Sequence, residues 1–167
     1  MPDTELNSAL SQLFSELVDG ARAGGDAFIL NSGDVGLLRS LDRLSAEAAS
    51  QSVNAGATIA AHAQHVRYGL SLMNRWAREG GNPFANATWD AAWKISTVGT
   101  AEWEEIRNGL RAETSGWREV LSSRRAAGVT ELNGMIASIA HLAYHLGAIR
   151  QISTQTRGPR EGTFATT

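Results

Sequence analysis

The segment His141-Leu-Ala-Tyr-His145-Leu-Gly-Ala-Ile-Arg150 places two imidazoles four residues apart in an otherwise apolar run. Side chains four residues apart on an α-helix lie about 40° apart around the axis and about 6 Å apart along it. Both Nε2 atoms can therefore reach one ion at about 2.0–2.1 Å. The stretch therefore predicts a packed helix whose two histidines are spaced like the ligands of a metal site.

The other two histidines of the chain lie together in Thr58-Ile-Ala-Ala-His62-Ala-Gln-His65, so all four histidines fall in two predicted helices. Spacing of this kind also arises by chance, and a histidine on an amphipathic helix is often a hydrogen-bonded core or surface residue. Imidazole is, however, the commonest metal ligand in proteins. The concentration of all four histidines favours a metal site, and histidines without a metal remain the alternative.

The composition narrows the kinds of site that the chain can build. A chain of 167 residues is one domain that can bury a core without disulfides or a structural metal, so a bound metal is expected to be functional. The absence of cysteine excludes a disulfide framework, a thiolate zinc site, an iron–sulfur cluster and a cysteine nucleophile. A formal charge of -2, with dispersed basic residues, argues against nucleic acid as a partner.

The N-terminus and the aromatic residues bear on location and partners. Met-Pro-Asp-Thr-Glu lacks the basic start and apolar run of a signal peptide, and no segment offers the ~20 apolar residues of a membrane span. We therefore expect a cytoplasmic protein without a membrane partner. Helical bundles with spare aromatic surface commonly pair about a two-fold axis, which predicts a homodimer. The five tryptophans are expected to pack in the core and at interfaces: Trp76, Trp89, Trp93, Trp103 and Trp117.

Helical periodicity appears four times along the chain, with no run of strand-type alternation. Long helices are expected over residues 4–22 and 56–78, from a cap at Thr100 to a turn at 122–128, and after a cap at Thr130. A connector helix is expected at 36–50, with Ser45 capping a second short turn, and a crossover loop at 82–98. The predicted fold is all-α, a four-helix bundle in one domain over residues 1–152, followed by a polar tail at 153–167.

These motifs resemble those of the DinB/YfiT-like superfamily of bacterial metal-binding four-helix bundles. Thr58-Ile-Ala-Ala-His62 is similar to the helix-two histidine motif of that family, and His141-Leu-Ala-Tyr-His145-Leu-Gly147 is similar to its helix-four HxxxHxG motif. Ile149 and Arg150 also fit the pattern, whereas Ala148 stands where many members carry glutamine. The resemblance implies a divalent ion, usually zinc or nickel, on His62, His141 and His145.

The resemblance leaves His65 as a pocket neighbour or an alternate ligand. His62 and His65 differ by about 60° around a helix, so a modest rotation would exchange their roles. Arg150 could bind a substrate carboxylate or a thiol-cofactor group, and the alternative is that it serves the helix dipole and solvent. Thr58 and Ser138, about a turn before His62 and His141, are candidates for orienting the imidazoles.

Three neutral imidazoles leave the charge of a divalent ion uncompensated, which favours deprotonation of bound water and leaves room for a substrate atom. Because neither HExxH nor a Glu-x-x-His pair is present, the metalloprotease and di-iron chemistries are set aside. Some members of the family activate a low-molecular-weight thiol such as mycothiol or bacillithiol. We therefore expect a metal-dependent transferase or hydrolase acting on a small molecule. The alternatives are a non-enzymatic metal-binding or stress-response protein and a dimeric scaffold.

Overall fold

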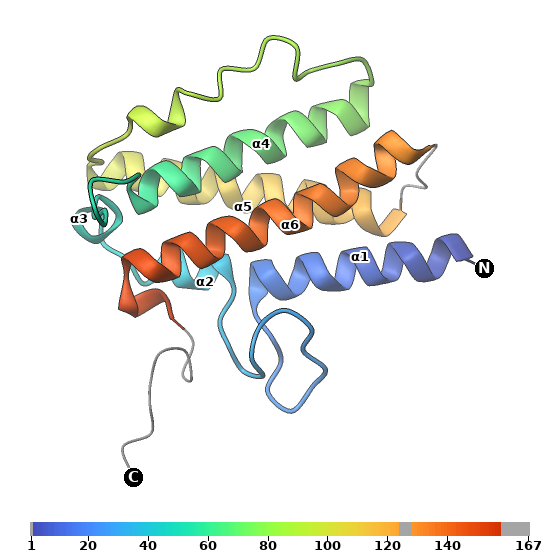
Figure 1. The fold of residues 1–167 in the computed structure, drawn as a ribbon, viewed down its shortest axis with the longest axis horizontal. Helices are drawn as coiled ribbons and strands as arrows, with labels where there is room; N and C mark the ends of the chain where they lie inside the picture. The colour runs from blue at the N-terminus through green and yellow to red at the C-terminus, as the bar shows by residue number, and fades with distance from the viewer. Residues whose placement is uncertain (1, 124–127, 158–167) are drawn as a thin grey trace.

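The computed structural model describes residues 2–123 and 128–157, and over these residues the regular structure is helical (Figure 1). Its four long helices are α1 (Pro2–Asp19), α4 (Ile59–Glu79), α5 (Thr100–Ser123) and α6 (Val129–Ile152). Helix α4 packs against both α5 and α6, and α1 packs against the same two helices. The predicted all-α class is confirmed.

The core lies between the four long helices and is built from their apolar stripes. Trp103 and Trp117 of α5 are almost completely buried, as the sequence predicted for the tryptophans in general. Each indole N–H is also satisfied: Trp103 Nε1 donates to the carbonyl of Leu44, and Trp117 Nε1 donates to Ser138 Oγ. Burial of a leucine or phenylalanine side chain contributes about 1.5–3 kcal/mol to folding, and tryptophan is larger than either. The other largest buried side chains include Phe14, Leu17, Leu110, Leu121, Leu142 and Leu146.

The helix that carries His62 and His65 has well-defined ends. Thr58 is its N-cap, with Oγ1 accepting from the amide of Ala61 at 3.1 Å. Gly80 ends it with φ +72°, a left-handed conformation that glycine adopts without steric cost. Helix α4 thus begins three residues after the predicted start at 56, because the threonine side chain satisfies the first free amide.

Two predicted caps are wrong, by one position for α5 and by two positions for α6. The carbonyl of Gly99 accepts from the amide of Trp103, so Thr100 is the first residue of α5 and not its cap. Gly128 precedes α6, which begins at Val129 and therefore includes Thr130. Glycine is common at helix N-caps, together with serine, threonine, aspartate and asparagine.

The expected connector at 36–50 is two short helices, α2 (Leu37–Asp42) and α3 (Ala46–Ala49). Ser45 caps α3 by accepting from the amide of Ala48, as predicted. The loop before α2 is held to α1 by the Glu16 carboxylate, which accepts four hydrogen bonds of 2.6–3.2 Å from the amides of residues 28–30. The Glu16 carboxylate therefore anchors this loop to α1.

The segments after α4 and α6 complete the fold. Residues 80–99 run back along α4 with one 3₁₀ turn, η1 (Ala92–Lys94), where the sequence predicted a crossover loop (Figure 1). After α6, η2 (Thr154–Thr156) packs against α6 and α2, and Thr156 is fully buried. The packed chain thus continues past residue 152, and the rest of the predicted tail lies outside the described residues, as does most of the predicted turn at 122–128. No helix among the described residues is long and apolar enough to cross a bilayer.

Candidate metal centre

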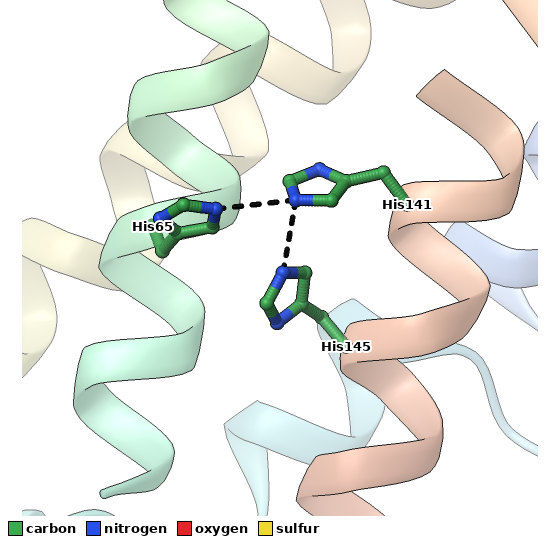
Figure 2. A group of neighbouring side chains, drawn as sticks. All are labelled: His65, His141 and His145. Atoms are coloured by element: carbon green, nitrogen blue, oxygen red, sulfur yellow. Dashed lines mark hydrogen bonds between the residues drawn. The ribbon is translucent and has the colours of Figure 1, made fainter. Parts of the chain in front are cut away.

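Three imidazoles from two helices converge on one point (Figure 2). His65 reaches across from α4, and His141 and His145 come from consecutive turns of α6. One ligand nitrogen from each ring lies within 4.8 Å of those of the other two. His141 Nε2 is 3.1 Å from His65 Nε2 and 3.0 Å from His145 Nε2. The fold therefore brings together the two histidine segments that the sequence singled out.

The spacing of these nitrogens fits a shared cation. Two nitrogens that each lie about 2.0–2.1 Å from one tetrahedral ion are about 3.3 Å apart, close to the separations of 3.0 and 3.1 Å. A ring nitrogen offers either one N–H or one lone pair, so His141 Nε2 makes only one well-directed hydrogen bond at a time. A cation would satisfy all three lone pairs together. The cluster could therefore hold a metal ion.

His62 lies on the other side of His145. Its Nδ1 is 2.9 Å from His145 Nδ1, so the ring that carries a hydrogen on this nitrogen can donate it to the other ring. When that hydrogen belongs to His145, His145 Nε2 carries the lone pair that faces His141. The structure thus places His65 in the converging group, whereas the family resemblance implies His62 there. The assignment of His62 as a ligand remains a prediction.

The two residues suggested for orienting the imidazoles have other partners. Thr58 Oγ1 caps α4 and donates to the carbonyl of Ile95. Ser138 Oγ accepts from Trp117 and donates to the carbonyl of Met135. The side chain that contacts the second nitrogen of a clustered ring is instead His62, whose Nδ1 faces Nδ1 of His145. Sequence spacing could not reveal this contact, because the two residues are 83 positions apart and meet only through helix packing.

Burial keeps the four imidazoles neutral. Desolvation by burial lowers the pKa of His62 and of His141. Burial, followed by the charges of neighbouring imidazoles, lowers the pKa of His65 to about 4 and that of His145 to about 3. Neutral imidazole is the form that binds a metal ion. The cluster is therefore ready for a cation at neutral pH.

The same shifts predict how the stability of the metal-free protein depends on pH. In the unfolded chain His65 and His145 bind protons near pH 6.5, whereas in the folded protein they stay neutral until about pH 4 and 3. The unfolded state therefore binds more protons in this window. Lowering the pH from 6.5 to 4 should reduce the free energy of unfolding by up to about 1.4 kcal/mol per pH unit for each histidine.

Urea unfolding of chelator-treated protein across this pH range measures the effect. His65→Gln, which removes one of the four imidazoles whose pKa burial lowers, should reduce the slope of stability against pH. An unchanged slope in His65→Gln would show that His65 titrates normally in the folded protein.

The crossover loop packs its aromatic side chains against the histidines. The Trp93 ring stacks on His65 with centroids 4.3 Å apart and an angle of 25°, and the centroid of Trp89 lies 5.6 Å from that of His65. The loop is anchored nearby, because the amide of Thr88 donates to Tyr68 Oη. Trp89 and Trp93 are partly exposed and contact His65. The sequence predicted core or interface packing for the tryptophans and did not identify this contact. The one sequence signal for this contact was that Trp89 and Trp93 lie in a segment without helical periodicity.

Arg150 does not face this cluster. Its guanidinium lies 3.5 Å from the Asp34 carboxylate and donates to the carbonyl of Val35. Both charged side chains are buried, with 5% of Arg150 and 1% of Asp34 exposed. Arg150 thus joins α6 to the loop before α2. The suggested role in binding a substrate carboxylate at the metal site has no support from this placement.

A cavity of about 440 Å³ opens beside the cluster, and His65 and His141 form part of its wall. Cavities of this size accommodate small molecules. Comparison with known proteins adds no relative: no family model, no curated protein and no solved structure matches the chain. The resemblance to the DinB/YfiT-like superfamily therefore remains a prediction, and the candidate metal centre stands on the geometry of this chain alone.

Proposed function

We propose that the protein binds one divalent metal ion through His65, His141 and His145 and uses it in a reaction on a small molecule. The convergence of these three imidazoles carries the proposal, since one nitrogen of each lies within 4.8 Å of the others. No aspartate or glutamate among the described residues joins these three histidines in the candidate ligand group. Three protein ligands are typical of catalytic zinc sites, which keep a position open for water or substrate.

The metal chemistry expected here is Lewis-acid activation of water or of a bound thiol. The protein residues have separate tasks. His62 orients His145 through their shared hydrogen bond, and Trp93 covers one face of His65 and limits access of water. The adjoining cavity offers the space in which a substrate can lie against His65 and His141. A transferase or hydrolase reaction is consistent with these parts.

We further propose that the fold is a four-helix bundle of the DinB/YfiT-like type. Two features support this proposal: four long helices that each pack against two others, and histidines on the second and fourth of them. Zinc and nickel are the ions proposed, because imidazole ligands accept both. A scaffold that holds a structural ion is the competing proposal.

Elemental analysis of protein purified without a metal-affinity tag tests the central proposal. We expect about one equivalent of zinc or nickel per chain, and saturating zinc should raise the melting temperature of chelator-treated protein, because an ion that binds only the folded state stabilises it. Wild-type protein that is metal-free and also fails to bind added zinc, nickel or cobalt in equilibrium dialysis would refute the proposal.

A further inference from the structure

We propose that the cavity beside the histidine cluster binds the apolar part of a small molecule that carries one metal-coordinating oxygen or sulfur group. The inference rests on the proposed function, because the coordinating group requires a metal on His65, His141 and His145. It adds the chemical class of the substrate: a compact, uncharged, largely apolar body with a single coordinating end.

The cavity lies between α4 and α6, with the histidine cluster at one side. Its walls are largely apolar, and two of the clustered imidazoles, those of His65 and His141, line it. A molecule in the cavity therefore touches the same rings that would hold the ion. The remaining lining residues are Val66, Gly69, Leu70, Met73, Trp89, Gly134, Ala137, Ser138 and Leu142.

Polar groups in the lining are few. Within the described part of the chain, no charged side chain lines the cavity. The one hydroxyl, Ser138 Oγ, accepts from Trp117 Nε1 at 2.8 Å and donates to the Met135 carbonyl at 2.7 Å. A ligand rich in hydroxyl or charged groups would therefore lose hydrogen bonds to water without replacing them here. The sugar part of a thiol cofactor would have to lie outside this cavity.

Gly69 sets the width of the cavity next to the cluster. This residue is in the interior of α4, where alanine would favour the helix more than glycine does. A Cβ added at Gly69 would lie 3.7 Å from the Trp89 ring and 3.8 Å from His141 Cε1, which is ordinary contact. Glycine thus leaves open a space between Trp89 and His141 that a methyl group would fill without a clash.

A series of linear hydroxamates tests the inference on protein loaded with cobalt(II), an ion that imidazole ligands accept and whose visible absorption reports coordination. The probes are acetohydroxamate, butanohydroxamate and hexanohydroxamate, which share one coordinating group and differ only in apolar length. We expect affinity to rise about two- to fourfold per added methylene as the chain enters the cavity.

Two variants test whether the gain in hydroxamate affinity comes from contacts inside the cavity. Gly69→Ala narrows it from α4, and Ala137→Leu fills it from α6. Both should weaken hexanohydroxamate by about tenfold or more and acetohydroxamate by less, because the shorter probe fills less of the cavity, and both variants should still bind cobalt. Ala112→Leu is the matched control, because it adds the same side chain at an exposed alanine of α5 outside the lining. This control should bind all three probes like the wild type.

Failure of this inference is distinguishable from failure of the proposed function. If the protein binds no cobalt, the metal site itself is refuted. If cobalt and acetohydroxamate bind but longer chains gain nothing, or if the gain survives in Gly69→Ala and Ala137→Leu, the substrate class is refuted. A dimer in light scattering that dissociates in Ala137→Leu but not in Ala112→Leu would show that a second copy of the chain covers the cavity, which also overturns the inference.

Discussion

His141→Ala is expected to abolish stoichiometric metal binding at micromolar protein concentration. His141 Nε2 is the nitrogen that lies near both other members of the group, at 3.0 and 3.1 Å. Binding of structural zinc contributes about 10–16 kcal/mol over four ligands, so the loss of one ligand costs about a hundred- to a thousandfold in affinity. His65→Ala should have an effect of the same size. Competition with a chromophoric chelator measures both affinities.

His62→Ala is the informative comparison. Because His62 contacts the second nitrogen of His145, its removal should weaken metal binding by about 10–100-fold while the number of ligands stays the same. The visible spectrum of the cobalt(II) protein reports ligand number, so it should be retained in His62→Ala and changed in His65→Ala. His62→Gln, whose amide can accept from His145, should recover part of the affinity.

The opposite result would identify the other ligand set. If His62→Ala loses the wild-type cobalt spectrum and His65→Ala keeps it, the ion binds to His62, His141 and His145, as the family resemblance implies. The two rings lie on neighbouring faces of α4, so a modest rotation of the helix would exchange them. His141→Ala loses the metal under either assignment and therefore tests the site as a whole.

Arg150→Met is expected to destabilise the protein by about 3–5 kcal/mol, because it leaves the buried Asp34 carboxylate without its cationic partner. Removing both charges should cost less than removing one, so Arg150→Met combined with Asp34→Asn should recover part of the loss. Urea unfolding of the metal-free proteins measures these differences.

The surface pair Arg118 with Asp19 gives the matched control. Its atoms are only 2.7 Å apart, but the two side chains are 36% and 52% exposed, so Arg118→Met should cost no more than about 1 kcal/mol. Folded Arg150→Met should also keep the wild-type cobalt spectrum and hydroxamate affinity. Unchanged stability together with weaker hydroxamate binding would instead make Arg150 a residue of the binding site.

Much of the helical architecture could be predicted from local patterns. The stripes of α1, α4, α5 and α6 repeat with a helical period, and Ser45 was recognisable as a cap because its hydroxyl needs only an amide three residues away. Helix starts were less predictable, since Gly99 and Gly128 precede helices that Thr100 and Thr130 were expected to cap. Several residue types can satisfy a free amide, and the sequence does not say which one does so.

Local sequence patterns were enough to predict a helical chain with its four histidines on two helices, because these are properties of residues close together along the chain. Which imidazoles meet depends on tertiary packing: His65 enters the cluster and His62 contacts His145, through contacts between residues 76 and 83 positions apart. Tertiary packing also turns Arg150 toward Asp34 and brings Trp93 onto His65. The rotation of α4 against α6 depends on the packing of the whole core, which no local pattern encodes.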